Sequence, residues 1–272
     1  KAGRDPGASA DMLNNMLALS RYKGNRPPEF LLTHPVTERR VADTRARTIS
    51  AKKRHYPESS DYFIMQARAA VIMQNDAKYS VSYFKQKLDA NTLQKKAVKY
   101  GLALAYSKLG DYNKASQILS TLLSQDPLNR LLVYTDIEND LLGKNYKSAL
   151  NKLDFQLKFN RKNYPLQSLL AETLWQSKQY KQSARVLSQL SNQRKEDPVV
   201  WYKLAEVRGL AGDISGVHKA RAEYFILIGA FERAKQQLNL AAKLLAYDFK
   251  QLSIIEQRVI DIEQMEKTLR RI

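Results

Sequence analysis

Histidines are the side chains in this sequence best suited to chemistry, and they are few and scattered. They are His34, His55 and His218, so no two of them are close in sequence. A catalytic zinc site needs several protein ligands in a fixed geometry, often two histidines of an HExxH helix, and the sequence contains no such pair. It also contains no cysteine, which excludes disulfides and thiolate chemistry, and no serine nucleophile motif. We therefore expect that this chain by itself is not an enzyme and holds no cofactor.

Aromatic and acidic side chains recur at a fixed spacing and form a second set of candidate functional residues. Glutamates recur at equal intervals at Glu138, Glu172 and Glu206, and tyrosines recur in the same phase one helical turn earlier. Tyrosine and tryptophan give a binding surface large contact area with few rotors to immobilise. The predicted groove residues are Tyr100, Tyr134, Glu138, Leu141, Glu172, Trp175, Tyr202 and Glu206. The alternative is that the tyrosines pack between helices and the glutamates pair with lysines of the next repeat, and the sequence leaves binding and packing open.

The fixed spacing comes from an internal repeat that is clearest around Tyr112. One constant shift along the chain carries Tyr112 onto Tyr146 and Tyr180, and the same shift carries Ala115 onto Ala149. Large and small apolar residues therefore recur in phase along the chain. A repeat length of about 34 residues is typical of a helix–turn–helix unit, which decides the fold class before any other feature.

One repeat unit contains two amphipathic helices, predicted at residues 96–109 and 112–123. Gly110 separates the two helices. The small side chains of Ala103 and Ala115 mark where the helices of a hairpin cross closely. A single hairpin cannot bury its own apolar face, so the units must stack.

This pattern resembles the tetratricopeptide repeat family. The residues that carry the resemblance are Leu102, Ala103, Tyr106, Gly110, Tyr112, Ala115, Leu119 and Pro127. The resemblance implies an all-α solenoid of about five to six helical hairpins, with the tyrosines that start each second helix in the seams and Trp201 in the core. Asp136 and Asp140 depart from it, because the family prefers apolar residues there, and Arg208 replaces an aromatic residue or leucine.

The phase of the repeat breaks at both ends of the array. Tyr79 is one residue out of phase, so we interpret residues 58–95 as an atypical first hairpin. Residues 229–234 resemble residues 110–115, but they follow Ile214, the previous residue in phase, after only half a repeat length. One helix at about residues 215–228 should therefore belong to two hairpins. A last helix at about residues 249–269 has one apolar face and is predicted to cap the array.

The N-terminal stretch carries a second, narrower resemblance. A short amphipathic helix is predicted to start at Ser9, Pro27-Pro28 forbids helix, and a further helix is predicted from Thr37 to Lys53. The stretch resembles the end of the catalytic domain in bacterial periplasmic zinc metallopeptidases that carry a C-terminal tetratricopeptide domain. The matching residues are Gly3, Asp5, Pro6, Arg26, Pro27, Pro28, Leu31 to Pro35, Glu38, Arg40, Ala42, Asp43, Arg45 and Arg47.

This second resemblance implies two domains. Residues 1–57 would be the C-terminal remnant of the metallopeptidase domain, a helix, a Thr-His-Pro loop and a helix. Residues 58–272 would be the repeat domain. The sequence does not begin with methionine, and we interpret it as a fragment whose HExxH helix and zinc-ligand glutamate lie upstream.

His34 and Arg40 acquire a role only through this resemblance. It implies that His34, in the Thr-His-Pro loop, lies over the zinc of the parent protein and is a metal ligand only in the intact protein, with Arg40 beside it at the rim. Imidazole binds zinc only when neutral, so this contact would weaken at low pH. The alternative is a loop histidine bonded to its neighbours, with Arg40 paired to Glu38 or Asp43.

The balance of charges sets the expected partners. The formal net charge is +18, from 45 basic and 27 acidic residues, and it is scattered rather than arranged in a nucleic-acid motif.

By resemblance we expect a periplasmic protein-interaction module whose partners are its own protease domain, the β-barrel assembly machinery and immature outer-membrane proteins. The alternatives are a stand-alone repeat adaptor, or a binder of anionic polymers such as lipopolysaccharide or nucleic acid. No apolar run is long enough to span a membrane.

Overall fold

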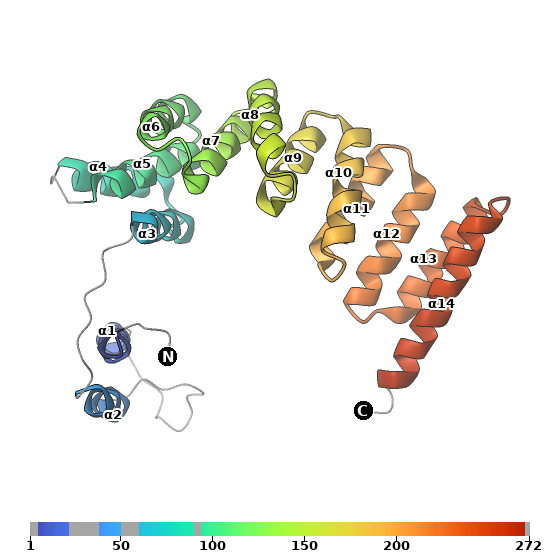
Figure 1. Ribbon diagram of the computed structural model, residues 1–272, viewed down its shortest axis with the longest axis horizontal. Coiled ribbons are helices and arrows are strands. Elements are labelled where there is room, and N and C mark those ends of the chain that lie inside the picture. The colour runs from blue at the N-terminus through green and yellow to red at the C-terminus, as the bar shows by residue number, and fades with distance from the viewer. Residues whose placement is uncertain (1–4, 22–37, 50–59, 90–93, 270–272) are drawn as a thin grey trace. The chain divides into compact units, whose positions relative to one another are not determined.

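The computed structural model describes residues 5–21, 38–49, 60–89 and 94–269. Contacts between Cα atoms divide the chain into two units, Lys1–Ser59 and Ser60–Ile272, and each is described by itself. All regular secondary structure in the described ranges is α-helical (Figure 1).

The first unit contains two helices that pack against each other, α1 (Gly7–Arg21) and α2 (Glu38–Thr48). Helix α1 begins two residues earlier than predicted, because the Asp5 carboxylate accepts a hydrogen bond from the Gly7 amide at 2.9 Å. The side chains of Leu17 and Val41 are buried. The predicted N-cap at Thr37 and residues 50–53 of the predicted helix lie outside the described part of the chain.

The second unit is a stack of helices, and the helices of residues 77–269 follow one another in space in chain order (Figure 1). Each of these helices packs mainly on its neighbours in the chain, which is the arrangement of a solenoid. The predicted all-α solenoid is therefore confirmed. The helices are α3 (Ser60–Met73), α4 (Ala77–Asp89), α5 (Lys95–Leu109), α6 (Tyr112–Gln125), α7 (Arg130–Leu142), α8 (Tyr146–Phe159), α9 (Tyr164–Gln176), α10 (Tyr180–Gln193), α11 (Pro198–Leu210), α12 (Ile214–Leu227), α13 (Phe231–Leu244) and α14 (Phe249–Leu269).

Short polar residues fix where these helices begin. Side-chain oxygens of Asn129, Asn163 and Asp197 accept hydrogen bonds from the first free amides of α7, α9 and α11. Gly110 ends α5 with a φ of 90°, a left-handed conformation that is strained for other residues. Asp111 and Asp248 cap α6 and α14 in the same way, and the predicted bounds of these two helices agree closely with the structure.

Small side chains lie where the helices cross, as predicted. Ala103 on α5 and Ala115 on α6 are both fully buried, and Leu119 packs with them in one core cluster. Trp201 is half-buried rather than central, because its ring packs on the edge of another cluster and its indole N–H donates to the Lys195 carbonyl at 2.9 Å.

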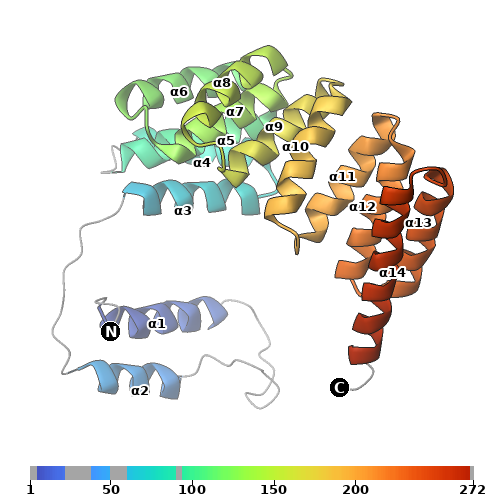
Figure 2. The same ribbon diagram turned by 45° about the vertical axis from the view of Figure 1, so that its right-hand side comes forward.

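The two ends of the array differ from its middle. Helix α3 packs mainly on α5 rather than on its chain neighbour α4. Helix α12 packs extensively on both α11 and α13, which confirms the shared helix predicted from the shift by half a unit. Helix α14 lies along α13 and covers its apolar face (Figure 2).

Candidate binding groove

A cavity of about 310 Å³ lies between α7, α9, α10 and α11 and brings together four of the predicted groove residues. These four are Tyr134, Glu172, Trp175 and Glu206. The alternate helices α7, α9 and α11 each supply part of this lining, and α10 supplies the rest. The regular repeat therefore does place equivalent residues of successive hairpins around one hollow, as the sequence predicted.

The walls of the cavity are mainly apolar. Leu187 and Leu190 of α10 are buried beneath it, and Val199 at the start of α11 is 58% exposed at its edge. Tyr164 forms a rigid side wall, because its ring lies under the Arg194 guanidinium at 4.6 Å and its hydroxyl donates to Asp197 at 3.1 Å. Burial, followed by the neighbouring Asp197, raises the pKa of Tyr164. A cavity of this kind can receive an aliphatic or aromatic side chain.

The polar groups of the cavity stand at its rim and carry net negative charge. Lys203 pairs with Glu172 at 3.4 Å, and Gln176 donates to the same carboxylate at 2.9 Å. Glu206 is exposed, and no cation among the described residues pairs with it. The rim therefore offers one uncompensated carboxylate to a ligand.

Two further predicted groove residues belong to a polar cluster that ties α3 to α5 and α7. Arg68 of α3 donates to the Tyr100 hydroxyl at 3.1 Å and pairs with Glu138 at 3.3 Å. The prediction that Tyr100 lines a groove is wrong, because its side chain is fully buried and its hydroxyl also bonds Thr135 at 3.0 Å. Hydrogen bonding and charge from Tyr100 and Glu138 outweigh the effect of burial and raise the pKa of Arg68, so it stays charged.

Tyr134 links this cluster to the cavity. Its ring faces the Arg68 guanidinium at 5.8 Å and also lines the cavity. Burial, with a smaller effect from Glu138, raises the pKa of Tyr134. Tyr134 therefore both packs against this cluster and lines the cavity.

The remaining two predicted groove residues are not part of the cavity. Leu141 is only 4% exposed and packs in the core of α7 and α8, because its side chain points into the hairpin. Tyr202 is half exposed, but it lies outside the cavity lining and packs edge-on against Tyr224 of α12, with 5.5 Å between ring centroids.

Lys152 was not among the predicted functional residues, although Asp136 and Asp140, with which it pairs, were identified as departures from the repeat pattern. Asp136 and Asp140 are buried on α7, and the Lys152 ammonium of α8 pairs with them at 2.6 and 2.7 Å. Ser148 also donates to Asp140 at 2.6 Å. Burial alone would lower the pKa of Lys152, but its two carboxylate partners outweigh burial and raise it. A buried ion triad thus replaces apolar packing in this hairpin.

Arg208 also finds polar partners at its unusual position. Its guanidinium donates to the Gly216 carbonyl and to the Ser188 hydroxyl, both at 3.1 Å. It therefore links α10, α11 and α12. Burial lowers the pKa of Arg208.

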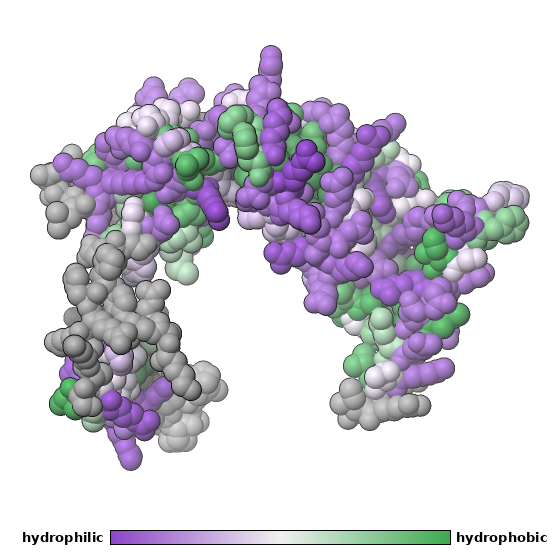
Figure 3. Space-filling model, viewed as in Figure 1, coloured by the Kyte–Doolittle hydropathy of each residue, from purple (hydrophilic) through white to green (hydrophobic). Residues whose placement is uncertain are grey.

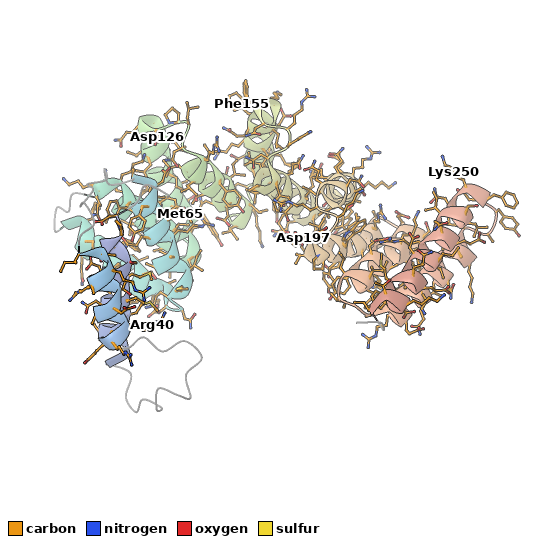
Figure 4. The ribbon with its side chains drawn as sticks, turned by 60° about the horizontal axis from the view of Figure 1, so that its bottom comes forward. Arg40, Met65, Asp126, Phe155, Asp197 and Lys250 are labelled. Carbon is orange, nitrogen blue, oxygen red and sulfur yellow. The ribbon has the colours of Figure 1, made fainter. Side chains whose placement is uncertain are left out.

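His34 and Arg40 are the two residues predicted at the rim of a zinc site. His34 lies outside the described residues, and Arg40 is an exposed residue of α2 (Figure 4). The nearby Asp43 pairs with Arg47 at 3.0 Å. Among residues 5–21, 38–49, 60–89 and 94–269, no group of three histidines and acids could hold a metal ion, and no helix could cross a bilayer.

Known proteins resemble this chain in sequence. The tetratricopeptide repeat family profile matches residues 141–207. The chain is 29% identical over 98% of its length to the β-barrel assembly-enhancing protease of Escherichia coli (strain K12), and 27% identical over its full length to that of Yersinia pestis. It spans 55% and 56% of these relatives, about half of each. A tetratricopeptide repeat protein from Parabacteroides merdae ATCC 43184 aligns with a TM-score of 0.48 at 15% identity, covering 94% of this chain and 99% of that one.

Proposed function

We propose that this chain, a tetratricopeptide-repeat region similar in sequence to β-barrel assembly-enhancing proteases, is the client-binding arm of such a protease. In this proposal it holds segments of immature outer-membrane β-barrel proteins during their assembly and quality control in the periplasm. The observation that carries the proposal is the cavity between α7, α9, α10 and α11, which joins apolar walls to the unpaired carboxylate of Glu206.

The cavity suits an unfolded segment better than a folded surface. Its volume of about 310 Å³ accommodates one or two side chains, which an extended chain can present without losing a folded core. The Glu206 carboxylate favours a lysine or arginine next to the inserted apolar residue. The wider assignment, including the β-barrel assembly machinery as a second partner, rests on the names of the relatives.

Residues 1–57 belong, in the same proposal, to the metallopeptidase domain of the intact protein. Zinc would be bound by residues of that domain. His34 and Arg40 would lie at the rim of its active site. If His34→Ala in the intact protein changed neither proteolysis nor zinc content, this assignment would be wrong.

The groove proposal can be tested with two exposed lining residues. We expect Glu206→Lys and Val199→Ser each to weaken capture of a urea-unfolded outer-membrane porin by about fivefold or more, since one reverses the rim charge and the other removes an apolar contact. Fluorescence anisotropy of the labelled porin measures capture. Glu256→Lys is the matched control, because Glu256 is an exposed glutamate of α14, which contributes no residue to the cavity.

Melting temperature separates binding from folding in this test. Both lining residues are exposed, so their variants should melt within a few degrees of the unsubstituted chain. Capture that stays at the unsubstituted level in both variants would rule out this cavity as the client site.

A further inference from the structure

The turn between α13 and α14 exposes large apolar side chains that nothing in the described structure covers. Tyr247 is 98% exposed, Phe249 is 81% exposed and Leu244 is 55% exposed. They lie close together in the sequence, at the tip of the last helical hairpin, where Figure 3 shows apolar residues. Exposed apolar groups gathered at one place mark an interaction surface more often than scattered ones do.

The backbone of this tip is fixed by hydrogen bonds. The Asp248 carboxylate caps α14 by accepting from the Gln251 amide at 3.0 Å, and the Asp248 amide donates to the Leu245 carbonyl at 2.8 Å. Tyr247 and Phe249 flank this capping residue. The cap therefore fixes the backbone on both sides of Asp248, and the two flanking rings are exposed in this conformation.

The charges around the rings are positive. Lys243 and Lys250 are exposed on either side of the turn, and Figure 4 shows Lys250 at the tip. The single acidic residue between them, Asp248, is engaged in the helix cap. The whole chain carries a net charge of +18, so its long-range field also attracts anionic surfaces.

Aromatic rings beside lysines on a convex tip match a lipid bilayer better than a protein partner. A stable protein interface buries about 800 Å² on each side, which a narrow hairpin end cannot provide alone. A bilayer accepts such a tip, since tyrosine and phenylalanine partition into the headgroup region while lysines meet the phosphates. The occupant indicated by shape and charge is thus a membrane surface.

We infer that the α13–α14 tip is a peripheral membrane anchor for bilayers that contain anionic phospholipids. Tyr247, Phe249 and Leu244 enter the headgroup region, and Lys243 and Lys250 bind lipid phosphates. The contact is reversible, because a few inserted side chains and two lysines give weak binding on their own. It is separate from the cavity, which α13 and α14 do not line.

Vesicle sedimentation tests this inference with the 272-residue chain. The vesicles contain phosphatidylethanolamine with about one quarter phosphatidylglycerol, a surface whose attraction for lysine is well defined. We expect Tyr247→Ser combined with Phe249→Ser to lower the partition coefficient about tenfold, since burial of two aromatic rings is lost. The matched control is Phe155→Ser combined with Phe159→Ser, a pair on α8 that is 58% and 78% exposed and should bind as the unsubstituted chain does.

A second readout reports insertion at the tip itself. In the Tyr247→Trp variant, lipids brominated on their acyl chains should quench the fluorescence of the added tryptophan. The unsubstituted chain, which contains Trp175 and Trp201, is the reference. Failure of the unsubstituted chain to bind the anionic vesicles would overturn the inference. So would equal binding by the tip variant, which would assign the attraction to the general basic surface. Loss of self-association in the tip variant with unchanged vesicle binding would instead make the tip a contact between copies.

Discussion

At the scale of single residues, the buried ion triad of Lys152, Asp136 and Asp140 is where this chain departs most from its repeat pattern. Two carboxylates that are 11% and 7% exposed in their side chains depend on one ammonium for compensation. Removing one partner of such a cluster leaves uncompensated buried charge, which costs more than the cluster itself contributes. Lys152 should therefore be the most sensitive lysine of the described array.

We expect Lys152→Met to lower the free energy of unfolding by about 2–3 kcal/mol, less than a fully buried pair would lose because 35% of the lysine side chain is exposed. Urea unfolding followed by circular dichroism measures this loss. Lys147→Met on the same helix is the control, since Lys147 is exposed and should change stability by less than about 0.5 kcal/mol. Adding Asp136→Leu and Asp140→Leu should restore stability, because apolar residues are what the repeat prefers there; a triple variant as unstable as the single one would contradict this account.

The pKa of Lys152 gives the same prediction a pH signature. Its pKa is raised in the folded chain, so the unfolded lysine loses its proton first as pH increases. The stabilisation by the triad is fully present below the ordinary lysine pKa of about 10.4 and is lost as pH rises through the folded value. The stability difference between the unsubstituted chain and Lys152→Met should therefore shrink above that pH.

At the scale of helices, Gly101 determines how closely α4 can pack on α5. A Cβ atom at this buried position would lie 2.3–2.7 Å from carbons of the Phe84 ring, inside van der Waals contact. Ala103 and Ala115 were predicted as the small residues of this region, whereas Gly101 was not. The omission has a physical reason, because Phe84 belongs to the atypical first hairpin, whose phase differs from the repeat.

We expect Gly101→Ala to destabilise the chain by about 1–3 kcal/mol in urea unfolding, since overpacking outweighs the gain in helix propensity. Combining it with Phe84→Leu should cost less than the sum of the two single changes. Gly209→Ala on α11 is the matched control: its Cβ would meet only Val217 at an ordinary 3.6 Å, so the variant should be more stable by about 0.5–1 kcal/mol. Equal effects of the two glycine substitutions would contradict the role of Phe84.

Helix positions followed from the sequence, whereas the surroundings of equivalent residues did not. The constant repeat spacing and the capping residues act locally, so α6, the shared α12 and the final α14 were predictable. Tyr100 and Tyr134 occupy equivalent positions, yet Arg68 reaches the hydroxyl of the first from a helix 32 residues away and buries it. Arg68 also contacts Glu138 across 70 residues, a pairing that no local pattern predicts. Half of the predicted groove residues therefore line the cavity. The surroundings of the other half depend on which helix packs next to each residue.

At the scale of the whole repeat unit, residues 60–272, stability should be distributed rather than centralised. The described core consists of separate apolar clusters along the array, one around α5, others around α8 and α11, and one shared by α12, α13 and α14. Each helix from α4 to α14 packs mainly on its chain neighbours. In such a solenoid, a perturbation at one end reaches only the adjacent hairpins.

Removal of α14 tests this distribution directly. A chain that ends at Tyr247 loses Ile255 and Ile262 from the last cluster and the Arg258–Glu223 ion pair of 2.6 Å that joins α14 to α12. We expect amide hydrogen exchange to become at least tenfold faster in α12 and α13 and to stay unchanged in α5 and α6, because those helices share no core cluster with α14. Glu263→Gln, an exposed change on the retained helix, should leave every region as it is. Acceleration of exchange in α5 to the same extent as in α13 would show instead that the array unfolds as one cooperative unit, and the distributed core would then have no energetic meaning.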